Sequence, residues 1–204
     1  MDERDRRRIF TIGHSVHELD AFIGLLERHR ITAVADVRSR PFSRLQQFNG
    51  DLLATVLRAR GIKYVPLGRE LGARRDEAEC YVDGRAVYEL VARLPLFQEG
   101  INRLIRGAAD HRIAIMCAEK EPLDCHRTVL ICRHLRPHDF QVLHILENGE
   151  LEDHGTTEKR MMEMLGIAPD LFHMEAAEAD LIEQAYEVRG RQIAYTTASE
   201  GIPA

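Results

Sequence analysis

Residues 113–135 decide how the rest of the chain is interpreted. They consist of Ile113-Ala-Ile-Met-Cys117, Ala118-Glu-Lys-Glu-Pro-Leu-Asp124 and Cys125-His-Arg-Thr-Val-Leu-Ile-Cys-Arg-His-Leu135. The apolar run predicts a buried strand at 112–116 that ends in a thiol, and the periodic apolar residues predict a helix at 124–135. A strand that leads directly into a helix is typical of an open α/β sheet, and such junctions are where these sheets bind ligands.

The same alternation of strands and helices runs along the chain. Apolar runs predict five strands, at 8–13, 31–35, 62–65, 112–116 and 140–145. Ser15 and Glu18 match a capping box at the start of a first helix, and Gly61 stands where a helix at 51–57 should end. Residues 66–85 are expected to form a long polar loop. We therefore predict a three-layer α/β fold, with a mainly parallel central sheet of about five strands and helices on both faces.

After the last predicted strand the pattern becomes helical. We expect amphipathic helices at about 156–165 and 174–188, with loose order from residue 189 onward. These expectations divide the chain into an α/β domain at 8–154 and a helical C-terminal extension at 155–204. The extension is a candidate surface for forming a homodimer.

The composition separates a basic region from an acidic one. The chain has 204 residues, a formal net charge of −5 and four cysteines. Arginines gather in the loops between residues 38 and 75, which favours an anionic partner. Acidic residues dominate 147–187, which argues against non-specific coating of nucleic acid. Without an apolar run of bilayer length or a signal sequence, we expect a cytoplasmic protein, not inserted in a membrane, with reduced cysteines.

Chemically capable side chains follow several predicted strands. Because the carboxyl ends of parallel strands share one edge of a sheet, these side chains are expected to meet. The candidates for catalysis are His14, Cys117, Cys125 and His126. The candidates for substrate binding are Ser15, Asp36, Arg38, Arg44, Arg69, Glu119 and Arg127.

Each candidate also has an ordinary structural interpretation. Ser15 can cap a helix, Asp36 can orient Arg38, and His14 can bond a neighbouring carbonyl. Cys117 can be a small buried apolar residue. Three further residues are expected to have no part in a site, because two lie in the core and one in a loop; they are Cys132, His144 and Cys80.

Three chemistries compete for the two cysteines. A phosphatase-type phosphate loop needs an arginine six positions after its cysteine, and Leu123 occupies that position. Zinc held by Cys117, Cys125 and a histidine stays open, although adjacent Cys125 and His126 are not expected to face one ion. We favour a thiolate nucleophile with no required cofactor, since a first-turn helical position beside Arg127 lowers a thiol pKa.

Several motifs carry a family resemblance. They are Thr11-Ile-Gly-His-Ser15, Asp36-Val-Arg38 with Pro41-x-Ser43-Arg44, Tyr64-x-x-Leu67-Gly-Arg-Glu-Leu-Gly72, Met116-Cys-Ala-Glu119 and Cys125-His-Arg127. Together, over about residues 9–154, they resemble domain-of-unknown-function family 488. The resemblance implies that the two cysteines, His14 and Arg38 form a family feature, and it implies no activity. Asp36-Val-Arg38 also resembles rhodanese-like domains, but the sequence departs from their single-cysteine loop.

These observations lead to two functional hypotheses. The first is an enzyme, either a thiol-dependent transferase or a hydrolase, that acts on a small anionic substrate that is phosphate-bearing or nucleotide-derived. The second is a non-catalytic binding module associated with nucleic acid, in which arginines hold phosphates and the cysteines are structural or bind zinc.

Overall fold

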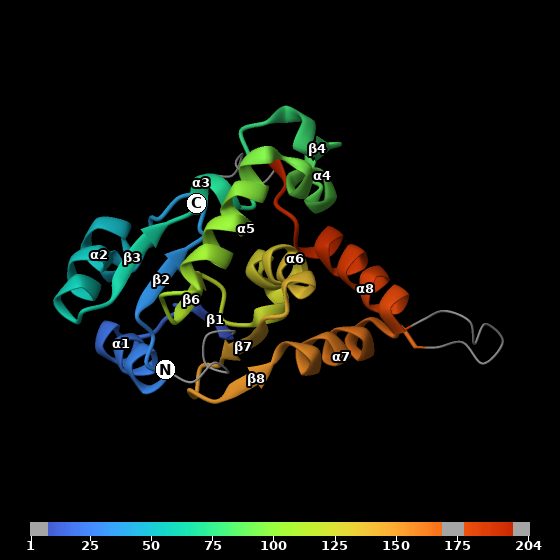
Figure 1. Ribbon diagram of the computed structural model, residues 1–204. Helices are drawn as coiled ribbons and strands as arrows, with labels where there is room; N and C mark the ends of the chain where they lie inside the picture. The colour runs from blue at the N-terminus through green and yellow to red at the C-terminus, as the bar shows by residue number, and fades with distance from the viewer. Residues whose placement is uncertain (1–7, 169–177, 198–204) are drawn as a thin grey trace.

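A six-stranded sheet forms the centre of the protein in a computed structural model that describes residues 8–168 and 178–197 (Figure 1). The strand order is β3-β2-β6-β1-β7-β8. The strands are β1 Arg8–Gly13, β2 Ala33–Asp36, β3 Lys63–Pro66, β6 Ile113–Cys117, β7 Gln141–Ile145 and β8 Leu151–Asp153. All neighbouring pairs are parallel except β7 and β8. The predicted mainly parallel sheet is confirmed, with an antiparallel strand added at one edge.

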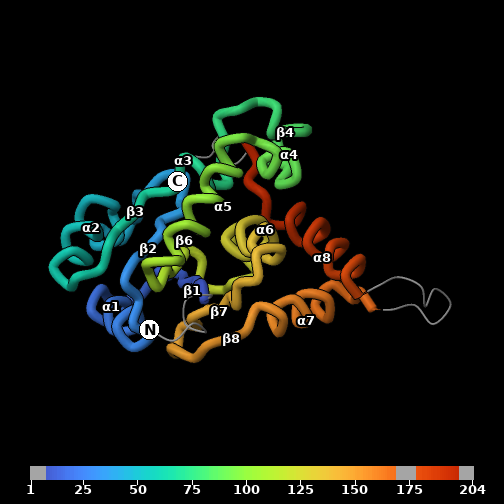
Figure 2. Tube along the Cα trace, in the orientation of Figure 1, coloured from blue at the N-terminus to red at the C-terminus, as the bar shows by residue number. Residues whose placement is uncertain are grey.

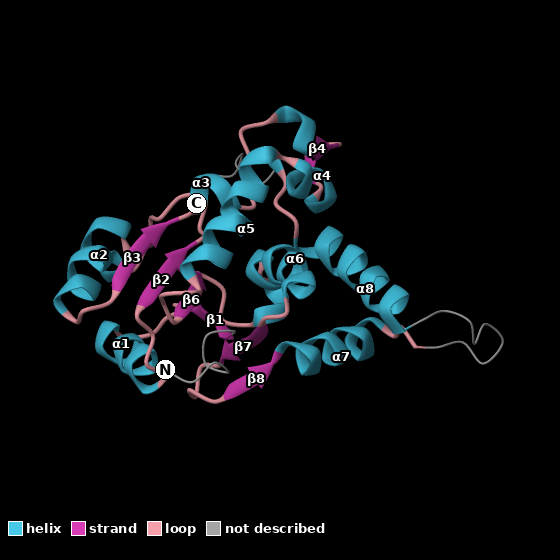
Figure 3. Ribbon diagram, in the orientation of Figure 1, coloured by secondary structure: helices cyan, strands magenta, loops and turns pink. Residues whose placement is uncertain are grey.

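Helices cover both faces of the sheet, which confirms the three-layer prediction (Figure 3). The α-helices are α1 Leu19–Arg28, α2 Gly50–Ala59, α3 Gly68–Leu71, α4 Tyr88–Arg93, α5 Pro95–Gly107, α6 Arg133–Leu135, α7 His154–Leu165 and α8 Glu178–Ile193. Shorter turns span Gln46–Phe48, Ala78–Cys80, Pro122–Asp124 and Arg136–His138, and Arg127–Cys132 is π-helical. No described helix is long and apolar enough to cross a bilayer.

Side chains alternate between two separate cores, because successive residues of a strand face opposite sides of the sheet. Phe10 and Ile12 of β1 pack with the apolar residues of α1 and α2. Ile9 faces the other way, toward a larger core that α4, α5, α6, α7 and α8 also line. The C-terminal helices α7 and α8 are therefore packed onto the same face as α5.

Two local expectations differ from the structure. Ser15 has a left-handed backbone, with φ of 46°, and α1 begins after Glu18 without a side-chain cap. The predicted capping box is therefore wrong. The predicted loop at 66–85 contains α3 and a hairpin, β4 Tyr81–Val82 and β5 Arg85–Ala86. Asp83 and Gly84 both have positive φ, the conformation of a type I′ hairpin turn.

The C-terminal segment also has more structure than the sequence predicts. Helix α8 extends to Ile193, whereas residues 174–177 of the predicted helix lie outside the described residues. After α8 the chain returns toward the hairpin (Figure 2), where the Ala86 amide donates to the Tyr195 carbonyl at 2.9 Å. The expected loose order therefore does not apply to 189–197, and residues 198–204 are outside the described part. This return brings Tyr195 to the sheet edge where the candidate site lies.

Strand register brings the predicted site residues together. Gly13 is paired with Cys117, and Asp36 is paired with Met116. Strands β1 and β2 lead into helices on one face, whereas β6, between them, leads to the π-helical turn on the other. Chains that diverge to opposite faces leave a crevice at the carboxyl ends of the strands.

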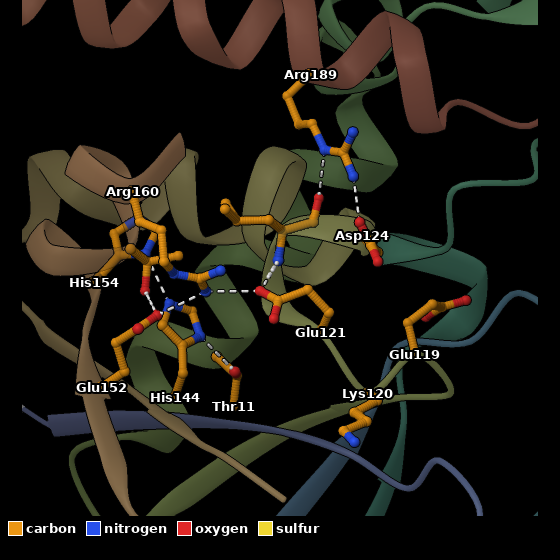
Figure 4. A network of polar contacts seen from close by, with 12 residues as sticks. Thr11, Glu119, Lys120, Glu121, Asp124, His144, Glu152, His154, Arg160 and Arg189 are labelled. Atoms are coloured by element: carbon orange, nitrogen blue, oxygen red, sulfur yellow. Dashed lines mark hydrogen bonds and ion pairs between the residues drawn. The ribbon is translucent and has the colours of Figure 1, made fainter. Parts of the chain in front are cut away.

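A buried polar network fastens α7 and α8 to the sheet. His144 Nδ1 contacts Thr11 Oγ1 at 2.7 Å, and His144 Nε2 contacts His154 Nδ1 at 3.0 Å. The hydroxyl of Tyr186 then lies 2.8 Å from His154 Nε2 and donates to Glu158 at 2.7 Å. Figure 4 shows His144 beside Thr11. The core role predicted for His144 is confirmed.

We expect this network to make the protein acid-sensitive. Burial lowers the pKa of His154 to about 4 and also lowers that of His144. The unfolded chain therefore binds more protons below pH 6.5, so stability is complete above that pH and is lost as pH falls toward 4. Between pH 7 and 5, His154 alone should lower the free energy of unfolding by about 2 kcal/mol.

Urea denaturation at both pH values tests this expectation. His154→Gln should reduce the pH dependence by that amount, whereas His138→Gln, at an exposed position, should leave it unchanged. An equal pH dependence in wild type and His154→Gln would contradict the assignment.

Candidate functional site

Two thiols and an imidazole form a compact buried group at the carboxyl end of β6, which we call the sulfur–imidazole cluster. His126 Nδ1 lies 3.7 Å from Cys117 Sγ and 3.8 Å from Cys125 Sγ. The three atoms all lie within 4.8 Å of one another. Cys117 and Cys125 are 3% and 1% exposed. The described cysteines are free thiols.

Cys125 and His126 converge although they are adjacent, contrary to our expectation. Cys125 has an extended backbone, with φ −132° and ψ 138°, whereas His126 is already helical, with φ −59° and ψ −23°. This change of conformation directs both side chains toward Cys117. His126 Nε2 lies 3.1 Å from the carbonyl oxygen of Val37, which can only accept. Nε2 therefore carries the hydrogen, and Nδ1 faces the sulfurs.

Positive charge around Cys125 favours a thiolate there. Burial raises the pKa of Cys125, but a hydrogen bond with Cys117 and the charges of Arg127 and His126 outweigh it and hold the pKa well below its usual value. The backbone amide of Arg127 also donates to Cys125 Sγ at 3.4 Å. The bond with Cys125, together with burial, raises the pKa of Cys117 well above its usual value. Cys125 therefore carries the charge of the pair.

Glu119 belongs to the same group. Its Oε2 lies 3.0 Å from Cys125 Sγ, and burial together with the charge of Cys125 raises the pKa of this carboxyl. Two anions would repel at this distance, so the thiolate of Cys125 favours the protonated form of the carboxyl. In Figure 4 Glu119 stands apart from the network that links Glu121, Arg160 and Glu152.

Arg127 stabilises the loop that connects the two cysteines of the cluster. Its side chain is completely buried, and it donates to the carbonyl oxygens of Glu119 at 2.6 Å and Lys120 at 3.1 Å. These bonds fix the loop between β6 and the π-helical turn. Arg127 has no exposed surface and lines neither cleft, so in this structure it positions the loop and balances negative charge.

A second group lies beside the cluster at the ends of β1 and β2. Asp36 accepts hydrogen bonds from Arg38 Nε at 2.9 Å and Nη2 at 2.5 Å, and from the Tyr64 hydroxyl at 2.7 Å. Arg38 Nη1 lies 3.2 Å from His14 Nε2. Since Arg38 can only donate, His14 Nε2 accepts, and His14 Nδ1 donates to the Ser15 carbonyl at 3.0 Å. Both ring nitrogens of His14 are thus engaged, Nε2 with Arg38 and Nδ1 with the Ser15 carbonyl.

A cleft opens onto both groups. It has a volume of about 500 Å³, and Cys117, Glu119, His126 and Arg38 line it. It continues into an outer cleft of about 760 Å³ that Arg69, Arg74 and Arg75 line. The two clefts share a wall formed by Ser39, Arg40, Arg74 and Tyr195. Reactive side chains therefore form the floor, and arginines form the rim.

Some of the predicted site residues line a cleft and others do not. Cys117, His126, Glu119 and Arg38 line the inner cleft, and Arg69 lines the outer one, whereas Cys125 contacts His126 without lining either cleft. Ser15 and Arg44 do not line either cleft.

Sequence reasoning missed several contacts of the site. These residues are Phe48, whose ring stacks on His14 at 4.4 Å, Tyr64, which holds Asp36, and Tyr195, which lies beneath Arg74 at 4.7 Å. Tyr64 lies in a quoted motif and could have been noticed. Tyr195 is far away in sequence and could not.

Two motif glycines allow the site to close. A side chain on Gly13 would overlap the carbonyl of Glu119, and one on Gly68 would overlap the carbonyl of Arg38. Both glycines therefore permit backbone segments of the site to approach more closely than any side chain allows. This explains their place in the Thr11–Ser15 and Leu67–Gly72 motifs.

Fold and site together define an α/β protein with a cysteine–histidine cluster at the carboxyl edge of a mainly parallel sheet. The family model of the domain of unknown function DUF488 matches residues 18–133. The chain belongs to this family. The matched range includes Asp36–Arg38, Leu67–Gly72 and the segment from Cys117 to Arg127, whereas the Thr11–Ser15 string precedes it. Neither the curated proteins nor the solved structures include a match to this chain.

Proposed function

We propose that this protein is an enzyme that acts on a small anionic substrate, phosphate-bearing or nucleotide-derived, in the inner cleft. One observation carries the proposal: a cleft with arginines on its rim has Cys117, His126 and Glu119 on its floor. Arginines on the rim are suited to hold a charged group, while the groups at the floor are suited to nucleophilic or proton-transfer chemistry.

The charge of the cleft supports an anionic substrate. Arg40, Arg69 and Arg74 are exposed at the rim, as is Asp76. Arg38 and Arg75 are buried and form ion pairs with Asp36 and Glu77. Asp124 at the inner cleft forms an ion pair with Arg189. The exposed charge that a ligand meets first is therefore mainly positive.

We expect the rim arginines to bind pyrophosphate. The double variant Arg69→Gln/Arg74→Gln should lose two charge-assisted contacts and weaken binding at least ~10-fold, measured by isothermal titration calorimetry. Arg58→Gln removes an exposed arginine that lies near the C-terminal end of α2 and lines neither cleft. It should leave pyrophosphate binding unchanged. Equal losses in both variants would show that only the overall charge matters and would contradict a cleft site.

Thiol labelling tests whether the cluster is accessible from the cleft. In the presence of EDTA at neutral pH, iodoacetamide should modify Cys117 or Cys125 before Cys132. Cys117 lines the cleft, whereas Cys132 is buried in the helix core and burial raises its pKa. Peptide mass spectrometry gives the order of labelling, and pyrophosphate should slow the reaction. Earlier labelling of Cys132 would contradict the proposed accessibility.

A binding module for single-stranded nucleic acid is the second candidate. It is favoured by aromatic rings at the cleft, namely Phe42, which is 79% exposed, and Tyr195 beneath Arg74. Exposed aromatic and arginine side chains are what such modules use to hold bases and phosphates.

Cysteine variants distinguish the two candidates. An enzyme should convert at least one member of a panel of nucleotides and phosphate esters, and Cys117→Ala should abolish that conversion while Cys132→Ala does not. A binding module should instead be retained on single-stranded DNA in a salt-dependent way, equally in wild type and Cys117→Ala. Such retention without any conversion would overturn the proposed enzyme.

A further inference from the structure

We propose that the sulfur–imidazole cluster binds one Zn²⁺ ion through Cys117, Cys125 and His126, with a fourth position open to the inner cleft beside Glu119. This inference deepens the proposed function, on which its catalytic meaning rests. The metal site itself stands on the geometry and charge of the cluster.

The spacing of the donor atoms matches a tetrahedral zinc site. With Zn–S of about 2.3 Å and Zn–N of about 2.05 Å, the edge between sulfur and nitrogen is about 3.6 Å. The two distances from His126 Nδ1 to sulfur are 3.7 and 3.8 Å. The third edge, between the two sulfurs, is about 3.8 Å in such a site, and here all three donor atoms lie within 4.8 Å of one another. One ion therefore fits among the three donors.

The surroundings of His126 are those of a metal ligand. Nε2 donates to the Val37 carbonyl at 3.1 Å, so the lone pair of a neutral ring lies on Nδ1, toward the sulfurs. A backbone carbonyl that orients a ligating histidine in this way is common at zinc sites. On the other side, the bonds from Arg127 to two loop carbonyls hold the segment between Cys117 and Cys125 in place.

Charge balance favours a divalent cation. Arg127 is fully buried and forms no ion pair with a carboxylate in the described ranges 8–168 and 178–197. A metal ion would displace the proton of Cys117. Two thiolates and the Glu119 carboxylate, set against the Arg127 guanidinium, would then carry a net charge of −2, which one Zn²⁺ neutralises. Thiolate and imidazole donors together select zinc over magnesium or calcium, which prefer oxygen.

The open side of the cluster faces the cleft. Cys117, His126 and Glu119 all line it, so a water molecule or substrate atom can complete the coordination. Three protein ligands with one open position are characteristic of catalytic zinc, whereas structural zinc has four protein ligands. The same donors, two sulfurs and one imidazole with a nearby glutamate, activate water in zinc-dependent deaminases.

The implied chemistry is hydrolysis. With zinc held by Cys117, Cys125 and His126, the ion would supply Lewis acidity for adding water to an electrophilic carbon or phosphorus of the substrate. Glu119 would be placed to take one proton from that water and to return it to the leaving group. Water is the only co-reactant, and no oxidant or reductant is needed.

Metal analysis of the full chain tests the site directly. Protein purified without chelators should contain about one zinc per chain, and Cys125→Ser and His126→Gln should each contain less than about a tenth of that. Cys80→Ser changes an equally buried cysteine outside the cluster, and it should keep the metal.

Cobalt gives a measurement that needs no variant. Chelator-stripped wild type, reconstituted with Co²⁺, should show a thiolate-to-cobalt charge-transfer band and the visible bands of tetrahedral cobalt. Added azide should change the visible bands if the fourth position is open. Stripped protein that binds no cobalt would overturn the metal site, and a spectrum insensitive to azide would overturn the open position.

Glu119→Gln separates the role of this carboxyl from metal binding. It should retain zinc while losing conversion of whichever substrate the nucleotide panel identifies; loss of zinc would make Glu119 a ligand and contradict the open position. Zinc content does not depend on conversion. A metal-free protein that converts substrate would therefore overturn only the zinc inference, and a zinc-containing protein that converts nothing would overturn only the proposed enzyme.

Discussion

Replacing Gly13 with alanine should lower the free energy of unfolding by about 3 kcal/mol or more. The added methyl group would overlap the carbonyl oxygen of Glu119, and the Cα atom of Lys120 lies only 3.2 Å from the same position. These neighbours are backbone atoms, so they cannot move aside as the end of a flexible side chain can. Relief requires the loop after β6 to shift away from β1. That shift would also break the bond from the His14 amide to the Cys117 carbonyl, now 2.9 Å.

Gly24→Ala provides the matched control. Gly24 lies inside α1, and a methyl group there would meet nothing within 4 Å. Alanine should therefore stabilise this helix by about 0.5–1 kcal/mol. Urea denaturation of both variants gives the comparison, and zinc content of Gly13→Ala reports whether the loop has moved. If the two substitutions have similar effects on stability, Gly13 is not needed for close packing.

The contrast between these glycines illustrates what the sequence can predict. Apolar runs such as Ile113–Met116 mark buried strands, because only apolar side chains suit a sheet covered on both faces. Strand ends then place His14, Arg38 and Cys117 at one edge. The fold class and most of the inner cleft follow from these local signals. That Gly13 rather than Gly24 is structurally required does not follow, because it depends on a loop more than a hundred residues away.

Local sequence patterns do not predict some other features of the fold and the site. The convergence of Cys125 and His126 depends on backbone angles that neither residue type dictates. Strand β8, Leu151–Asp153, is too short for a periodic pattern, and its pairing with β7 is set by the turn at Gly149, where φ is 79°. The hairpin is a different case. Asp83-Gly84 is a strong turn signal that the prediction of a loop at 66–85 overlooked.

Asp36 and Arg38 form a buried ion pair at the site, so Asp36→Asn should be a second severe substitution. Asp36 is 1% exposed and accepts bonds from the amide and side chain of Arg38 and from Tyr64. Asparagine has nearly the same shape but no charge, and it leaves the buried guanidinium uncompensated. Loss of one partner of a buried pair costs about 3–5 kcal/mol. Asp20→Asn, at a surface carboxylate 3.7 Å from Arg60, should change stability by less than about 0.5 kcal/mol.

A double variant separates the charge effect from packing. Asp36→Leu/Arg38→Met replaces both charges with apolar groups, and it should recover most of the stability that Asp36→Asn loses, because no unpaired charge remains. The same variant should still bind pyrophosphate more weakly than wild type, since Arg38 lines the inner cleft. Urea denaturation and calorimetry on one preparation measure both properties. If the double variant is as unstable as Asp36→Asn, the pair contributes through its shape and hydrogen bonds, and the unpaired guanidinium is not the cause of the loss.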